Sequence, residues 1–342
     1  MSVIDLVEQG WLPDPLTRVG MRAMNYLRLW EEGTWNEQRR ELRQRAFRNS
    51  LLEGPLAAHT DAANDQHYEV PAAFFQLALG RNLKYSCCYY PRGAESLDEA
   101  EEAMLQLTCE RAGLADGMRI LELGCGWGSL SLWMAKHYPR AQITALSNSA
   151  SQKAFIDSEA QARGLRNLRI ITADMNTFDI DERFDRVISV EMFEHMRNYD
   201  LLLSRVRGWC DDGGRLFVHY FCHRELAYPF EAVGEQNWMA RNFFTGGIMP
   251  SYAMLKGFPK YFRMERDWWV NGTHYERTAN HWLQRMDAER LRVGDIFHQA
   301  YGADQSTIWV QRWRMFFMAC AELFGTRGGE VWGVGHYLMA PA

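Results

Sequence analysis

Hydrophobic and polar residues follow different spacings in successive parts of the chain. Between residues 16 and 55, apolar side chains such as Trp30 recur at helical intervals among charged ones, which predicts amphipathic helices. Ser96 and Glu99 have the spacing of a capping box, so a further helix is predicted from there to Ala112. The N-terminal part of the chain is therefore predicted to be largely helical.

Short β-type runs then alternate with helical ones. Helices are predicted at 129–137, 151–163 and 199–209, and strands at 118–123, 142–146, 168–172, 186–190 and 215–220. Strand-like runs return at 263–270 and 331–339, on either side of a helical stretch from about 278 to 323. Strands that alternate with helices at this spacing predict parallel pairing. The expected fold class is α/β, with a doubly wound, mostly parallel, seven-stranded sheet of the Rossmann-like type.

These changes of pattern divide the chain into four regions. Residues 1–95 are expected to form a helical segment that covers the site, and residues 96–220 an α/β core that binds a cofactor. Residues 221–262 are rich in glycine, proline and aromatic residues and are predicted to be an inserted lid. Residues 263–342 supply the remaining core strands and the C-terminal helices.

Composition narrows the class of protein. The formal net charge of -5 argues against nucleic acid as a partner. Seven cysteines without a Cys-x-x-Cys pair predict free thiols in a reducing, cytoplasmic setting. No run approaches the ~18 uninterrupted apolar residues of a membrane span, and the first residues lack the apolar core of a signal peptide. The histidines show no metal-ligand spacing, so no metal is expected.

A glycine turn carries the strongest functional signal. Gly124, Gly126 and Gly128 follow a predicted strand and open a predicted helix, so the backbone there can pass close to a ligand. A dinucleotide site would place its third glycine one residue later and an acidic residue about 20 residues on. The observed spacing instead favours S-adenosylmethionine, with Glu122 of the strand near its amino group.

Other residues that follow the predicted strands are candidates for the rest of the cofactor. Ser147 and Gln152 can hydrogen-bond the ribose hydroxyls, and Asp174 with Met175 can contact the adenine. Structural alternatives remain open, because Ser149 has the character of a helix cap and Asp174 is also a suitable N-cap.

Four separate segments resemble the cyclopropane-fatty-acid synthase superfamily of S-adenosylmethionine-dependent methyltransferases. They are Tyr85-Ser-Cys87, Leu123-Gly-Cys-Gly-Trp-Gly128, Leu146-Ser with Gln152, and Glu191-Met-Phe-Glu-His-Met196. Further segments, such as Glu194-His-Met-Arg-Asn-Tyr199 and Cys222-His-Arg-Glu-Leu-Ala-Tyr228, resemble its coclaurine N-methyltransferase-like branch. The resemblance implies methyl transfer to the nitrogen of a small, often aromatic amine, with Tyr85 and Ser86 at the cofactor.

The same resemblance implies two catalytic groupings. The first is the pair Glu194 and His195, because an amine that is protonated at neutral pH needs a base before it can attack a methyl group. The second belongs to an alternative function, a cyclopropane-fatty-acyl-phospholipid synthase or related carbon methyltransferase that uses bound bicarbonate as base. In that family the ion is held by residues that match Cys87, Glu194, His219 and Tyr275.

His219 ends a predicted strand at the edge where ligands of such sheets bind, which favours a role in the site. If the segment around Tyr275 is extended, His274 and Tyr275 face opposite ways, so at most one of them reaches the site. A small-molecule methyl acceptor is the expected partner; membrane contact would follow only from the lipid alternative, and a homodimer is left open. A third alternative is a binding protein that retains the fold without catalysis.

Overall fold

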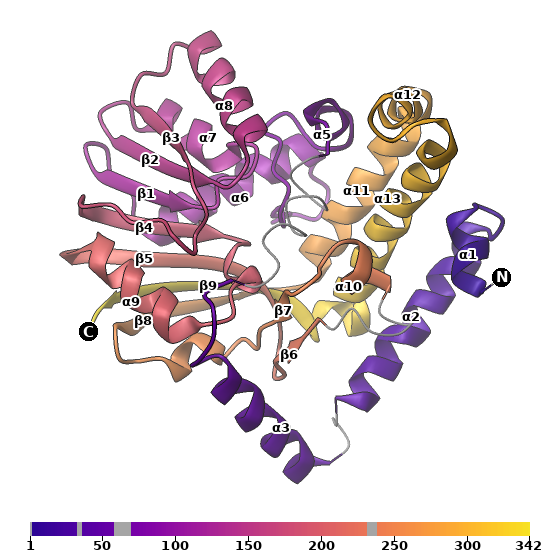
Figure 1. Cartoon of the computed structure of the whole chain (residues 1–342), viewed down its shortest axis with the longest axis horizontal. Helices are drawn as coiled ribbons and strands as arrows, with labels where there is room; N and C mark the ends of the chain where they lie inside the picture. The colour runs from indigo at the N-terminus through magenta and orange to yellow at the C-terminus, as the bar shows by residue number, and fades with distance from the viewer. Residues whose placement is uncertain (1, 33–35, 58–69, 231–237) are drawn as a thin grey trace.

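The computed structural model describes residues 2–32, 36–57, 70–230 and 238–342 (Figure 1). Parts of the predicted N-terminal segment and of the predicted lid therefore lie outside the described residues. At the centre is a seven-stranded sheet in the order β3-β2-β1-β4-β5-β9-β8. Its strands are β1 (Arg119–Leu123), β2 (Gln142–Ser147), β3 (Leu168–Thr172), β4 (Phe184–Val190), β5 (Cys210–His223), β8 (Phe262–Val270) and β9 (Trp332–Pro341).

The first five strands in this order are parallel, and β9 runs antiparallel to both of its neighbours. The prediction of a mostly parallel, seven-stranded Rossmann-like sheet is confirmed. The strand starts and ends agree with the predicted ones to within about two residues, except that β5 extends from Cys210 to His223 rather than over 215–220.

Alternating residues of the strands pack against helices on opposite faces of the sheet. Ile120 and Ile188 lie in a cluster with residues of α6 (Leu97–Ala112) and α7 (Ser129–His137). Leu121 and Val187, which directly neighbour Ile120 and Ile188 in the sequence, pack with α9 (Tyr199–Trp209) on the other face. Helix α8 (Ala150–Ala162) packs beside α7 against β2 and β3. Both faces are covered, as the apolar strands of a doubly wound sheet require.

The predicted capping box begins α6 as expected. Ser96 Oγ accepts the backbone N–H of Glu99, and the Glu99 carboxylate accepts the backbone N–H of Ser96. At the other end, Gly113 adopts φ +62°, the left-handed conformation that closes many helices. The local sequence thus sets both ends of this helix.

A cluster of helices lies beside the carboxyl ends of the strands (Figure 1). It contains α5 (Ala72–Ala78), α11 (Thr273–Ala288), α12 (Arg290–Tyr301) and α13 (Ala303–Phe324), packed around rings such as Phe74, Trp282 and Trp313. The single long helical stretch that was predicted is therefore three helices. The extended conformation considered for His274 and Tyr275 is wrong, because both lie in the first turn of α11.

The N-terminal helices are α1 (Val3–Glu8), α2 (Asp14–Glu31) and α3 (Glu37–Ser50), which confirms the predicted helical pattern. Helix α2 lies along α13 (Figure 1), where Arg314 binds the carboxylates of Asp14 and Asp287. The region 221–262 contains β6 (Tyr228–Pro229), α10 (Trp238–Asn242), β7 (Ile248–Met249) and the 3-10 turn η4 (Met254–Gly257).

Three general expectations can be compared with the described part of the chain. All seven cysteines are buried free thiols. No group of three or more potential metal ligands occurs among the described residues. No helix in the described ranges has both the length and the apolar character to cross a membrane.

Candidate active site

A cavity of about 230 Å³ lies at the carboxyl ends of β1, β2 and β4 and extends to the side chains of α11 and α13. This is the edge at which open α/β sheets bind ligands. All nine residues predicted to bind the cofactor line this cavity: Tyr85, Ser86, Glu122, Gly124, Gly126, Ser147, Gln152, Asp174 and Met175. The parallel strands therefore bring together the residues that the sequence singled out.

The three glycines of the turn have different physical roles. Each has a positive φ, of +79° at Gly124, +51° at Gly126 and +79° at Gly128. A Cβ on Gly124 would lie 2.9 Å from Met192, and one on Gly128 would lie 2.7 Å from Ile156, so both positions are closed by packing. A Cβ on Gly126 would meet no atom within 4 Å and would point into open space. Gly126 is thus where the backbone can approach a ligand.

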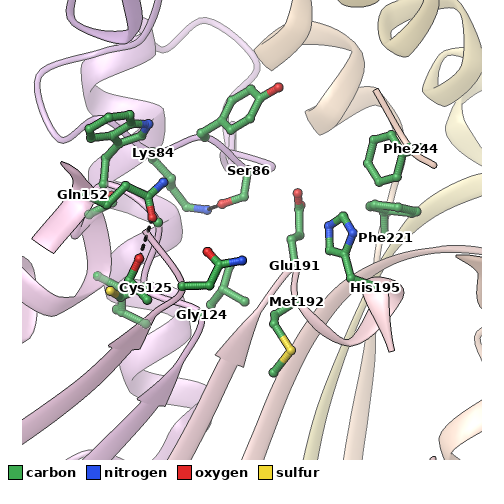
Figure 2. A pocket seen from close by; sticks show the side chains of 18 of the residues that line it. Lys84, Ser86, Gly124, Cys125, Gln152, Glu191, Met192, His195, Phe221 and Phe244 are labelled. Carbon is green, nitrogen blue, oxygen red and sulfur yellow. Dashed lines mark hydrogen bonds between the residues drawn. The ribbon is translucent and has the colours of Figure 1, made fainter. Parts of the chain in front are cut away.

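Two buried, oppositely charged residue types line the cavity beside this turn. Glu122 accepts a hydrogen bond from the Ser131 hydroxyl, and burial raises its pKa to about 7. The buried Lys84 donates through Nζ to Ser86 Oγ (Figure 2). Together they match the amino and carboxylate groups of the methionine moiety of S-adenosylmethionine. Sequence reasoning missed Lys84, because lysine side chains are usually exposed and no spacing pattern marks this one.

Glu101 of α6 holds the loop that carries Lys84. Its Oε1 accepts the backbone N–H groups of Gly80 (3.0 Å) and Lys84 (3.1 Å), and its Oε2 accepts that of Asn82 (2.8 Å). The loop includes Leu83 at φ +50°, an uncommon conformation for a residue with a Cβ. A single buried carboxylate therefore sets the path of the backbone into the site.

Cavity-lining and capping residues lie side by side at the carboxyl ends of β2 and β3. Ser147 Oγ donates to Gln152 Oε1 at 2.8 Å within the cavity wall. Ser149 caps α8 by accepting the backbone N–H of Gln152. Asp174 accepts the backbone N–H of Asn176 at 2.8 Å and closes a turn, with no α-helix starting there. Ser147 and Asp174 keep their place in the cavity lining.

The four residues predicted to be catalytic are not all in the cavity wall. His195 and Tyr275 line it, whereas Glu194 and His219 lie behind it. Glu194 is fully buried and accepts the backbone N–H of Phe221 at 2.9 Å, and burial raises its pKa well above the ordinary value. The fully buried His219 is separated from the cavity by Glu191. The catalytic roles of all four stay predictions.

Glu191, which sequence reasoning did not select, lies close to His195 in the cavity (Figure 2) and contacts two other residues of this group. Its Oε1 accepts the Cys87 backbone N–H at 3.1 Å and lies 3.3 Å from His219 Nε2. Its Oε2 accepts the Tyr275 hydroxyl at 2.7 Å. Burial raises the pKa of Glu191, while Lys84 and these donors oppose that effect. Its position directly after β4 was the available sequence signal.

The geometry bears on the predicted bicarbonate site. Cys87, His219 and Tyr275, three of its four expected ligands, already surround the carboxylate of Glu191. A carboxylate has the planar O–C–O shape of the ion, so the chain itself supplies the group expected from bicarbonate. Glu194, the fourth expected ligand, binds the backbone of Phe221 instead. The bicarbonate prediction is therefore not supported.

Beyond Glu191 and His195 the cavity becomes aromatic. The His195 ring is stacked on Phe244, with centroids 5.6 Å apart and an interplanar angle of 7° (Figure 2). The other aromatic side chains that line this part are Phe221, Phe230, Trp282, Phe316 and Phe324. Such a wall suits a flat, apolar molecule whose polar group faces Glu191 and His195.

A Rossmann-like sheet whose glycine turn opens into a cavity with these groups defines the class: the protein is an S-adenosylmethionine-dependent methyltransferase. The family model for mycolic acid cyclopropane synthetase matches residues 57–334, and the chain belongs to that family.

Several of the similar proteins are N-methyltransferases. (S)-coclaurine N-methyltransferase of Thalictrum flavum subsp. glaucum is 36% identical over 345 residues, which cover 99% of this chain and 95% of the relative. The enzyme of the same name from Papaver somniferum is 35% identical, with 97% and 96% covered. The crystal structure of coclaurine N-methyltransferase bound to N-methylheliamine and S-adenosylhomocysteine has a TM-score of 0.95 and 33% identity, covering 99% of this chain and 98% of that one.

Proposed function

We propose that the protein transfers the methyl group of S-adenosylmethionine to the nitrogen of a small aromatic amine of the coclaurine type. The observation that carries the proposal is the position of Glu191 and His195 in the cavity wall, between the cofactor residues and the aromatic part. Full-length similarity to coclaurine N-methyltransferases supports the same acceptor class.

The cofactor end of the cavity fits S-adenosylmethionine, which when bound supplies an electrophilic methyl group. Lys84 and Glu122 would hold its carboxylate and amino groups. Gly126 would leave room for the ligand, and Ser147, Gln152, Asp174 and Met175 would contact the nucleoside.

The acceptor end must bind a cation and then remove a proton from it. An aliphatic amine is protonated at neutral pH and has no lone pair for attack until that proton is lost. Ionised Glu191 binds the ammonium group, because its carboxylate reaches the cavity from the end of β4. His195, which also lines the cavity, takes the proton. Phe221 and Phe244 hold the aromatic body of the amine so that its nitrogen is in line for transfer.

Glu194 acts in this proposal as a positioning residue. Its buried carboxyl group fixes the Phe221 backbone and the short 3-10 turn η2 (Phe193–His195) that carries His195. It is expected to stay protonated, because burial and the nearby Glu191 both raise its pKa.

The function is tested with methyl-labelled S-adenosylmethionine. Coclaurine and vesicles of unsaturated phospholipid are offered in parallel, with and without bicarbonate. We expect label in the amine, independent of bicarbonate. Label in the vesicles alone, dependent on bicarbonate, would overturn the proposal.

The roles of the two cavity residues are tested by substitution. Glu191→Gln is expected to raise KM for the amine and to lower kcat, and His195→Ala is expected mainly to lower kcat. Neither should change the affinity for S-adenosylhomocysteine, measured by calorimetry. Glu182→Gln on the exposed surface serves as the matched control for the lost carboxylate. Loss of cofactor binding in either cavity variant would assign that residue to the cofactor instead.

A further inference from the structure

We propose that Arg111, His336 and His219 form a chain of hydrogen bonds, here called the relay, that ends at Glu191. The relay keeps the Glu191 carboxylate ionised, so that it accepts hydrogen bonds. The catalytic consequence of the relay rests on the proposed amine methylation. Arg111 and His336 are positioning residues in this proposal, since neither lines the cavity.

The relay crosses three secondary-structure elements. Arg111 lies in the last turn of α6, and its NH1 is 2.8 Å from His336 Nδ1 on β9. His336 Nε2 is 2.9 Å from His219 Nδ1, and these two residues are register partners on adjacent antiparallel strands. His219 Nε2 is 3.3 Å from Glu191 Oε1, which is the longest link. Both histidines are fully buried.

The chemistry of Arg111 gives the relay one direction. A guanidinium group only donates hydrogen bonds, so His336 Nδ1 must accept and carry no proton. A neutral His336 then carries its proton on Nε2 and donates it to His219 Nδ1. By the same step His219 donates from Nε2 to Glu191. Arg111 thus fixes the tautomers of both imidazoles, and each donor points towards Glu191.

Charged and titratable groups surround both ends of the relay. Glu191 is faced by Lys84, by Cys87 and Cys88 of the same segment, by His195 and Glu194 of η2, by Tyr275 of α11 and by Cys320 of α13. Arg111 is faced by Glu110, Tyr89 and Tyr252 and packs over the Trp268 ring at 5.0 Å. Burial lowers the pKa of both His219 and His336, in agreement with neutral rings.

The relay has a consequence for catalysis. A carboxylate whose neighbours all donate is stabilised in its ionised form, which is the form that binds an ammonium group. Because Arg111 cannot accept a proton, the relay cannot carry the substrate proton away. The proton must leave through another group, and His195 of the cavity wall has that role in the proposed function.

The first experiment reads the tautomers without substrate. Histidine labelled with ¹⁵N is incorporated into the full chain, and the ring nitrogens of His219 and His336 are assigned with His→Gln variants. We expect Nε2–H tautomers at both positions, unchanged between pH 6 and 9, and a loss of the single tautomer at His336 in Arg111→Met. A protonated Nδ1 on either ring of the unaltered protein would overturn the proposal.

The second experiment uses the pH profile of kcat/KM for the amine. In His336→Gln the amide oxygen can accept from Arg111 and the amide N–H can donate to His219, so the direction of the relay is kept. His336→Leu and Arg111→Met break it. We expect the acid limb to move to higher pH by about half to one unit in His336→Leu and Arg111→Met. This is the size expected when Arg111 no longer acts on Glu191 through the two imidazole rings. The acid limb should stay in place in His336→Gln.

Two comparisons separate the relay from other effects. Arg140→Met removes an exposed arginine that pairs only with Asp116 among the described residues, and it should leave the profile unchanged. Equal shifts in His336→Gln and His336→Leu would refute the relay. If no amine is methylated but the tautomers are as expected, the proposed function fails and the relay stands.

Discussion

Replacing Tyr275 with phenylalanine tests how Glu191 is kept ionised. The substitution removes the hydroxyl that donates to Glu191 Oε2 at 2.7 Å and keeps the ring, which is stacked on Phe324 with centroids 4.3 Å apart. The packing around α11 should therefore be retained. Cys87 and His219 still contact Oε1, so only one of the donors is lost.

The expected size follows from the charge on the acceptor. A hydrogen bond to a charged group contributes about 1.5–3 kcal/mol, and ~1.4 kcal/mol corresponds to one pKa unit. Loss of the hydroxyl should raise the pKa of Glu191 by roughly one to two units, since the donor stabilises the ionised form. The fraction of ionised Glu191 at a given pH on the acid side then falls, and the acid limb moves to higher pH.

The assay is kcat/KM for the amine between pH 5.5 and 9.5. On the acid limb, Tyr275→Phe should be roughly 10- to 100-fold slower than the unaltered protein, and the two profiles should converge at alkaline pH. Tyr261→Phe, which removes a hydroxyl bound to Asp200 away from the cavity, is the control. An equal loss at every pH, with the acid limb in place, would refute the reasoning and give Tyr275 a direct role in the transfer step.

Three further predictions concern the cofactor end of the site. Glu101→Gln should lower the free energy of unfolding by about 1–3 kcal/mol in denaturant titration, because the amide nitrogen that replaces one carboxylate oxygen cannot accept the backbone N–H bound there. Gly126→Ala should lose affinity for S-adenosylhomocysteine and lower Tm only through the strain of its φ of +51°, whereas Gly128→Ala should lower Tm further, because its Cβ would in addition lie 2.7 Å from Ile156; the opposite pattern would contradict the assigned turn. Burial raises the pKa of Glu122 to about 7, so Glu122 becomes ionised as the pH rises from 6 to 8. Because the ionised form binds an ammonium group better, the affinity for S-adenosylmethionine should rise over this range. Calorimetry of Glu122→Gln should find no such rise.

The sequence predicts the parts of this fold that depend on neighbouring residues. Alternation of apolar residues located the strands, and the carboxyl ends of parallel strands lie at one edge of the sheet, so Glu122, Ser147 and Asp174 line one cavity. The start of α11 was missed because it depends on contacts distant in sequence. A Cβ on Gly272, just before this helix, would lie 2.0 Å from the Trp332 carbonyl oxygen, so a glycine is required there for packing and not for a local turn.

The proposed catalytic groups were harder to predict for a related reason. Both Glu191 and Glu194 follow β4, and only the backbone conformation decides which carboxylate enters the cavity. Glu191 has φ +48°, an uncommon conformation that local sequence does not predict and that directs its side chain towards Cys87 and Tyr275. The choice between the two carboxylates therefore required the structure.

His219 shows that a residue near the ligand-binding edge of a sheet does not necessarily line the cavity. Its position near the end of β5 favoured contact with a ligand, yet Glu191 lies between it and the cavity. The neighbour that matters for its chemistry is His336, which antiparallel β9 places directly opposite although the two are 117 residues apart. In this proposal the ionisation of Glu191 is thus set partly by residues of β9 and α6 that do not line the cavity. Acceptor chemistry in this protein should therefore be tested on Glu191 and its hydrogen-bond partners as well as on the Glu194–His195 pair that the sequence motif presents.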